Sequence, residues 1–261
     1  MSRCAKLVGR TLVGAATVAA ASYAAYAGIT WYRYGRPSRY GNQDGPDSLL
    51  DLYMPEYEVA ERHHIRVFAP AETTFATACQ MDMLRSAAIR FLIKTRELAL
   101  RCVAEATGLG FPIREQIGQE KEAPQKGLVN ELTTKGWGVL AEIPGREIVL
   151  GTVTQPWVAE TGFRALPAAE FADFHEPGYV KIAVTLCADQ LSPSQSTART
   201  ETRVTTTDPA ARAKFRRYWS LVSPGAILIR KILLRNLKAE AESQALESAP
   251  LWEGSIQPSP H

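Results

Sequence analysis

Two adjacent histidines, His63 and His64, are the side chains of this sequence best suited to acid–base chemistry. An imidazole with an ordinary pKa titrates near neutral pH, so it can both donate and accept protons. Neighbouring residues of a strand point to opposite faces of a sheet, so the pair cannot bind one metal ion together. We expect His63 on the apolar face, either as an acid or base in a cavity or as a hydrogen-bonded core residue, and His64 in solvent.

The four cysteines form no recognisable metal or redox motif. They are scattered along the chain, without a C-x-x-C pair and without a histidine at ligand spacing: Cys4, Cys79, Cys102 and Cys187. We expect free thiols that pack as small apolar side chains, although Cys79 and Cys102 flank one helical region and could approach each other. The sequence also has no nucleotide-binding loop and no nucleophile motif, so it predicts neither a metal nor a cofactor.

Length and charge limit the possible partners. The chain has 261 residues, of which 46% are hydrophobic, enough for one core. Its net charge of +3 is small and spread along the chain, without the dense basic face that binding to a phosphate backbone requires. Nucleic acid is therefore not an expected partner.

The N-terminal region contains an uncharged stretch at 11–32, close to the roughly 20 residues that cross a bilayer as a helix. We expect a single-pass membrane anchor that includes Leu12, Val18, Tyr26 and Trp31. A cleaved secretory signal is the alternative, since Ala25-Tyr26-Ala27 supplies a small-x-small pattern, and the domain would then be secreted or periplasmic. Basic residues flank both ends equally, so the membrane orientation is open.

Alternating apolar and polar residues predict strands at 57–69, 179–188 and 197–206. Two extended runs at 137–143 and 146–154, divided by Pro144-Gly145, predict a hairpin. Helical spacing predicts helices at 72–79, 86–107 and 128–133, a short one at 167–174, and a surface loop at 108–126. The face of the last two strands that carries Lys181, Arg199, Glu201 and Arg203 is expected to be solvated.

A long final helix is predicted to begin after Asp208, a suitable N-cap, with Pro209 at the first helical position. Its apolar seam runs from Phe215 to Leu237 at steps of three or four residues. Pro224-Gly225 interrupts this seam, so we expect a kink there.

In this order, the elements resemble the SRPBCC superfamily, the helix-grip group that includes START lipid-transfer domains, polyketide cyclase-like proteins and birch-pollen-allergen-like proteins. The resemblance covers about 49–241 and is carried by these segments: Ile65-Arg66-Val67-Phe68-Ala69-Pro70 with Phe75, the hairpin at Gly145, Gly178-Tyr179-Val180-Lys181-Ile182, and Thr200-Glu201-Thr202-Arg203-Val204. It implies an α+β fold in which a curved antiparallel sheet wraps a long C-terminal helix, here preceded by an N-terminal hydrophobic helix. It also implies an apolar pocket between sheet and helix.

The predicted organisation has three parts: an anchor or signal segment with a linker at 1–47, the helix-grip domain at 48–241 and a disordered tail at 242–261. We expect these residues to line the pocket: Trp157, Tyr218, Trp219, Val184 and Thr202. Core packing is the alternative for the aromatic residues.

The favoured function is a membrane-tethered domain that binds a lipid or another hydrophobic small molecule. An enzyme of the polyketide cyclase or hydrolase type, with His63 moving a proton, is the alternative, and a scaffold with a filled interior is a third possibility. The oligomeric state is open.

Overall fold

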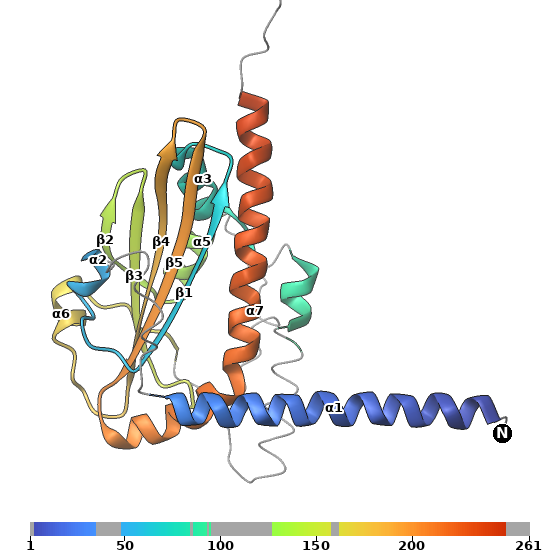
Figure 1. Cartoon of the computed structure of the whole chain (residues 1–261). Helices are drawn as coiled ribbons and strands as arrows, with labels where there is room; N and C mark the ends of the chain where they lie inside the picture. The colour runs from blue at the N-terminus through green and yellow to red at the C-terminus, as the bar shows by residue number, and fades with distance from the viewer. Residues whose placement is uncertain are drawn as a thin grey trace, which may run out of the picture.

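A single antiparallel sheet and one long helix dominate the computed structural model of this chain (Figure 1). The structure describes residues 3–34, 48–83, 86–92, 94, 127–157 and 162–248. Within these residues the sheet has five strands: β1 (Val59–Val67), β2 (Gly138–Ile143), β3 (Glu147–Thr154), β4 (Val180–Ser192) and β5 (Gln195–Thr206). Their order across the sheet is β1-β5-β4-β3-β2. All five strands lie where the sequence predicts them.

Two hairpins, β2 with β3 and β4 with β5, supply four of the five strands of the sheet. Gly145 has a φ of 72° between β2 and β3, a torsion that glycine adopts without steric cost. The hairpin of β4 and β5 is the longest ladder, with Val180 opposite Thr206 and Ser192 opposite Gln195. Strand β1 then pairs with β5 along its whole length, which places the N-terminal strand at the sheet edge beside the final helix.

The final helix, α7 (Pro209–Ser248), begins as its sequence predicts. The backbone N–H groups of Ala210 and Ala211 donate to Asp208 Oδ1 at 2.8 and 3.0 Å, so Asp208 caps the helix. Pro224 lies inside α7, and the ribbon bends between a short first arm and a long second arm (Figure 1). A proline removes one helical hydrogen bond and clashes with the preceding turn, which accounts for a bend.

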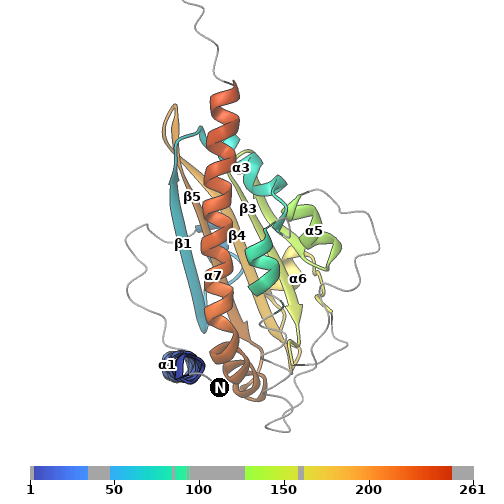
Figure 2. The ribbon, with the colours of Figure 1, turned by 90° about the vertical axis from the view of Figure 1, so that its right-hand side faces the viewer.

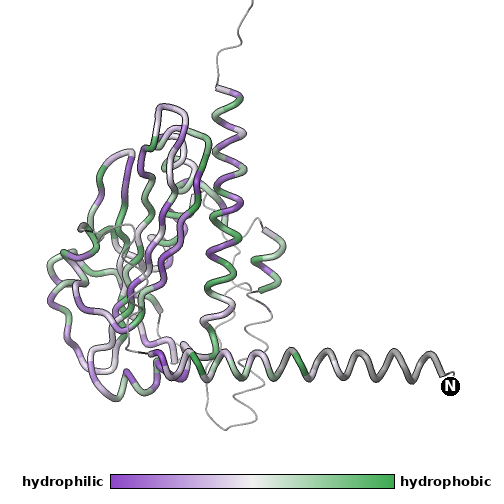
Figure 3. Tube along the Cα trace, viewed as in Figure 1, coloured by the Kyte–Doolittle hydropathy of each residue, from purple (hydrophilic) through white to green (hydrophobic). Residues whose placement is uncertain are grey.

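The helix α7 crosses one face of the sheet, and α3 (Ala71–Gln80) and α5 (Leu128–Thr134) cover the same face beside it (Figure 2). Green and purple alternate along α7 in Figure 3, as expected for a helix with one buried side. Its second arm packs through Leu234, Leu237 and Ala241 against Val67 and Ala198 of the sheet. This arrangement confirms the predicted α+β helix-grip architecture.

The opposite face of the sheet is also covered, by α2 (Ser48–Asp51) and α6 (Ala168–Ala172). Leu50, Met54 and Phe171 are fully buried there against Val149 and Ala183 of the sheet. The prediction of a solvated charged face is therefore wrong for Lys181, Glu201 and Arg203, which are 6%, 1% and 2% exposed.

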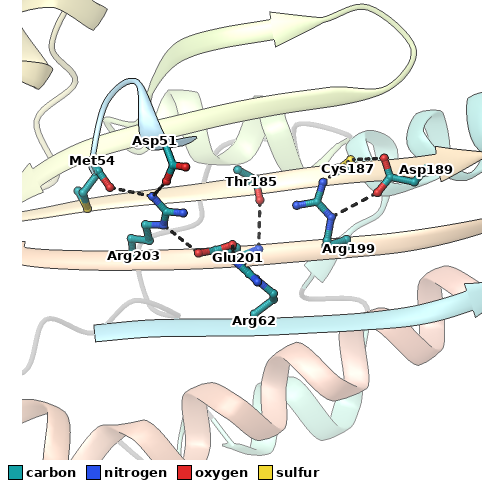
Figure 4. A network of polar contacts seen from close by, with 9 residues as sticks. All are labelled: Asp51, Met54, Arg62, Thr185, Cys187, Asp189, Arg199, Glu201 and Arg203. Carbon is teal, nitrogen blue, oxygen red and sulfur yellow. Dashed lines mark hydrogen bonds and ion pairs between the residues drawn. The ribbon is translucent and has the colours of Figure 1, made fainter. Parts of the chain in front are cut away.

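Two of these buried charges, Glu201 and Arg203, belong to a network of ion pairs and hydrogen bonds (Figure 4). The guanidinium of Arg203 contacts Glu201 Oε1 at 2.8 Å, the carboxylate of Asp51 and the carbonyl of Met54. Arg62 Nε donates to the second oxygen of Glu201 at 2.8 Å. Glu201 and Arg203 thus each have an oppositely charged partner, whereas Lys181 Nζ donates to the carbonyl of Ala172 at 2.8 Å, and these contacts explain how this face tolerates burial.

The N-terminal helix α1 (Arg3–Arg33) extends away from the domain and contacts it near its C-terminal end (Figure 1). Arg216 of α7 donates to the carbonyl of Trp31 at 2.8 Å, and the buried Tyr34 hydrogen-bonds to Glu58. No described helix is long and apolar enough to cross a bilayer.

The predicted single-pass anchor, with Leu12, Val18, Tyr26 and Trp31 as its residues, is therefore wrong, and with it the predicted membrane localisation. These four residues do lie in α1. Alanine, glycine, threonine and tyrosine make up most of the uncharged stretch at 11–32, and these residues are less apolar than leucine or valine.

Some predictions fall outside the described residues. Of the predicted helix at 86–107, residues 87–92 and 94 are helical and the remainder is not described, nor is the predicted loop at 108–126. The predicted boundary at 241 lies within α7, which continues to Ser248.

Candidate ligand-binding site

The α7-facing surface of the sheet carries a row of apolar side chains that helix α7 leaves half-buried. We define this surface by Glu61, His63 and Ile65 of β1, Thr200 and Thr202 of β5, and Ile182, Val184 and Leu186 of β4. Ile182, Val184 and Leu186 are each partly exposed, whereas Ala183, Thr185 and Cys187 on the opposite face are buried. The sheet is thus less completely covered on the side that faces the long helix.

Strand register assembles the polar centre of this surface. Glu61 lies opposite Thr202, which lies opposite Val184, and His63 lies opposite Thr200 in the next row. Directly opposed residues share one face of a sheet. His63, Thr202 and Val184, three residues predicted separately from the sequence, therefore lie on one face within two adjacent rows.

Helix α7 adds Arg230 to this surface. The Nη2 atom of Arg230 donates to Thr202 Oγ1 at 3.0 Å. Its Nη1 atom is buried and has no hydrogen-bond partner among the described residues. His63 Nε2 is buried and equally unpartnered among them, with Glu61 Oε2 at 3.7 Å, which is too long for a hydrogen bond. We call Glu61, His63, Thr202 and Arg230 the polar cluster.

Burial decides the charge of the cluster. It lowers the pKa of His63, and the charges of Arg230, Lys231 and His64 lower it further, so this imidazole is neutral at neutral pH. Burial raises the pKa of Glu61, although Arg230 and Lys231 act in the opposite direction. Burial also lowers the pKa of Arg230, but a guanidinium remains protonated in proteins. The cluster and the adjacent Lys231 therefore carry more positive than negative charge.

The predicted aromatic pocket residues lie elsewhere, at the end of the sheet where α7 begins. Trp219 and Tyr218 pack with Phe215, with ring centroids 6.0 and 5.8 Å from that of Phe215. Trp157 contacts the same group and lies beneath Lys214 at 5.6 Å. Trp219 is only 8% exposed, as expected for a residue that packs in a core. Their predicted role as pocket residues stays a prediction.

Sequence reasoning missed Arg230 and Glu61. Arg230 comes four residues after Ala226 and four before Leu234, so helical spacing already places it on the buried side of α7. Glu61 precedes His63 by two residues and so shares its face of the strand. The sequence signal for both residues is a charged side chain at a position where the periodic pattern expects an apolar one.

Two hollows lined by described residues lie at the rim of the domain. One, of 240 Å³, lies at the start of α7 beside Glu58, Asp208 and Arg212. The other, of 460 Å³, lies between Ala71, Arg146 and the end of β4. Neither lies over the polar cluster, so the predicted enclosed cavity under α7 stays a prediction.

The remaining reactive groups offer little chemistry. Cys79 and Cys187 are free thiols, and burial raises their pKa values to about 11 and about 12, which disfavours the thiolate. Cys102, the possible partner of Cys79, lies outside the described residues. Within the described part of the chain, no group of three or more His, Cys, Asp or Glu residues is arranged to hold a metal ion.

A five-stranded antiparallel sheet and a long C-terminal helix laid along one of its faces define the architecture. The chain has the helix-grip fold. This is the fold that the resemblance to the SRPBCC superfamily implied.

Comparison with known proteins adds distant similarities. No family model and no curated protein matches the chain. Among solved structures, a conserved protein from Geobacillus kaustophilus is 13% identical, with 71% of this chain and 97% of that chain covered and a TM-score of 0.32. The Zhui aromatase/cyclase from a Streptomyces species is 14% identical (71% and 94% covered, TM-score 0.25). Norcoclaurine synthase from Thalictrum flavum is 11% identical (68% and 95% covered, TM-score 0.28). Similarities this low do not bear on ligand or reaction.

Proposed function

We propose that this domain binds a hydrophobic small molecule between the α7-facing surface and helix α7. The observation that supports the proposal is the partial exposure of Ile182, Val184 and Leu186 on the side of the sheet that faces the long helix. Apolar side chains at the centre of a sheet are normally sealed by the layer above them. A ligand that removes this surface from water would be held by the hydrophobic effect.

The size of that effect is sufficient for useful affinity. Each methylene group transferred from water contributes about 0.8 kcal/mol, so a chain of about a dozen carbons gains roughly 9 kcal/mol when fully buried. Loss of translational and rotational freedom offsets an estimated 4 kcal/mol or more of this gain. An aliphatic ligand can therefore bind without a sequence motif that specifies it.

Filling the surface tests the proposal. Dodecanol, a neutral aliphatic probe, is titrated into the full chain and into a Val184→Phe variant, and binding is measured by calorimetry. We expect wild-type binding and a loss of at least about tenfold in the variant, because the larger ring occupies the space of the ligand. The matched control is Val139→Phe, a change at a position of β2 that is 45% exposed, and it should leave binding unchanged.

Circular dichroism verifies that both variants fold. Absence of binding of both dodecanol and its acid, dodecanoate, to the wild-type chain, or equal binding of dodecanol by both variants, would refute the proposed site.

Proton transfer at His63 is the second candidate function, because its imidazole is neutral and its Nε2 atom has no hydrogen-bond partner in the part of the chain that the structure describes. Such a group can act as a general base when a substrate proton comes within hydrogen-bond reach. Native mass spectrometry of molecules that copurify with the chain separates the two functions. A ligand of unchanged mass supports binding, whereas conversion of an added ligand that His63→Gln abolishes supports catalysis.

A further inference from the structure

We propose that the molecule bound at the α7-facing surface carries an anionic head group, a carboxylate, which Arg230 receives with His63 and Thr202 beside it. This inference rests on the proposed function and adds the chemical class of the ligand. The polar cluster distinguishes an acid from an alcohol, which hydrophobic contact alone would not do.

Arg230 lies on the side of α7 that faces the sheet. Leu234 and Leu237, on the same side of α7, are 7% and 4% exposed and pack against the sheet. Arg230 therefore projects into the space between helix and sheet, where its Nη2 atom reaches Thr202. A long cationic side chain more commonly extends toward water. Its inward direction suggests that it serves a partner inside.

Arg230 and His63 can both form further hydrogen bonds. A guanidinium offers five N–H donors in a planar fork, and neutral imidazole offers one donor or acceptor at each ring nitrogen. Arg230 Nη1 and His63 Nε2 are both buried without a partner among the described residues. Buried polar atoms are nearly always hydrogen-bonded in folded proteins, so two open positions in one cluster indicate a group that is still to be bound.

The polar cluster and the adjacent Lys231 carry a net positive charge. Arg230 and Lys231 are cationic, Glu61 is the acidic group of the cluster, and His63 is neutral at neutral pH. Among the described residues Glu61 forms no ion pair with Arg230, and its Oε2 atom lies 3.7 Å from Nε2 of the neutral His63. A ligand carboxylate would accept two parallel hydrogen bonds from the guanidinium fork and would neutralise the excess charge.

Apolar side chains of the sheet adjoin the polar cluster. Val184 and Leu186, both partly exposed, lie in the two rows that contain Thr202 and Thr200, whereas Leu150 and Ile148 of β3 beyond them are buried against α3. Val184 and Leu186 extend the surface from the polar cluster toward the middle of the sheet. The combination of one cationic centre with an adjoining apolar surface matches an amphiphile with a carboxylate at one end.

The test compares two probes that differ in the head group. Dodecanoate and dodecanol are titrated separately into the full chain at pH 7.5, where the free carboxylate is ionised. We expect wild-type protein to bind dodecanoate about tenfold more tightly or better, because hydrogen bonds to a charged group are the stronger ones. The Arg230→Met variant should lose this preference and should still bind dodecanol. Arg235→Met, at an exposed position of the same helix, is the matched control and should retain the preference.

The Arg230→Lys variant provides a second measurement if the methionine variant does not fold. It keeps the charge but loses the planar fork, so the preference should fall to an intermediate value. Equal binding of both probes by the wild-type chain, or an unchanged preference in Arg230→Met, overturns the inference and leaves the proposed function intact. If neither probe binds, the proposed function fails and the inference fails with it.

Discussion

Glu61 shows how burial sets the chemistry of a single residue. Its pKa is raised because burial disfavours the charged carboxylate more than Arg230 and Lys231 favour it. A raised pKa means that the folded chain binds a proton more readily than the unfolded chain does. The contribution of Glu61 to stability is therefore fully present below its unfolded pKa and is lost as the pH rises through its folded pKa.

The Glu61→Gln variant tests this sign. A neutral amide removes the unfavourable buried charge, so the free energy of unfolding should exceed that of the wild-type chain at pH 7, and the difference should shrink as the pH falls to 4. Urea titrations at both pH values measure it. Glu240→Gln, at an exposed position of α7, is the control and should change stability little. A Glu61→Gln variant that is less stable than the wild-type chain at pH 7 would show that the carboxylate is net stabilising there.

At the scale of elements, the joint between α5 and β2 depends on a glycine. Gly136 has a φ of 95°, and a Cβ atom at this position would lie 2.1 Å from the carbonyl oxygen of Phe163. Thr152 Oγ1 donates to the Gly136 carbonyl at 3.0 Å, which ties the joint to β3. The close approach brings segment 162–166 against the hairpin of β2 and β3.

The Gly136→Ala substitution should cost at least about 2 kcal/mol, because the new methyl group meets both an unfavourable torsion and a backbone atom that cannot move aside. Gly145→Ala is the matched control, since Gly145 also has a positive φ but has open space around it. There we expect a loss of about 1 kcal/mol from the torsion. Chemical denaturation measures both values, and equal losses would mean that the contact at Phe163 relaxes freely.

At the scale of the whole molecule, the sheet is an intermediate layer covered on both faces, although not equally. Helix α7 lies on one face, and α2 with the segment after it lies on the other (Figure 1). The ion pair between Asp51 and Arg203 joins positions 152 residues apart in the sequence. Arg203 also pairs with Glu201, which in turn pairs with Arg62 of β1. One network of ion pairs therefore connects α2 to two strands of the sheet (Figure 4).

Removal of Glu201 should therefore weaken the whole domain. Glu201→Ala leaves Arg203 and Arg62 without their shared partner and should cost about 3 to 5 kcal/mol of unfolding free energy. Glu176→Ala, which breaks a solvent-exposed pair with Arg164 at 3.0 Å, is the control and should cost less than about 1 kcal/mol. Similar losses in the two variants, measured by urea denaturation, would contradict a structural role for the buried network.

The sequence determined the elements because their causes are local. Period-two alternation predicted β1, β4 and β5, two extended runs divided by Pro144-Gly145 predicted the hairpin of β2 and β3, and Asp208-Pro209 predicted the start of α7. These patterns depend on torsion preferences and hydrogen bonds within a few residues, so they can be read before the chain folds.

The tertiary structure decided what each face contacts. Lys181, Glu201 and Arg203 alternate as exposed residues would, yet α2, from the N-terminal part of the chain, and α6, which precedes β4, bury them. The polar cluster likewise arises when β1 and β5 pair and α7 places Arg230 over Thr202. Burial and charge pairing at these positions depend on contacts between distant segments, and a pattern within one segment cannot contain that information.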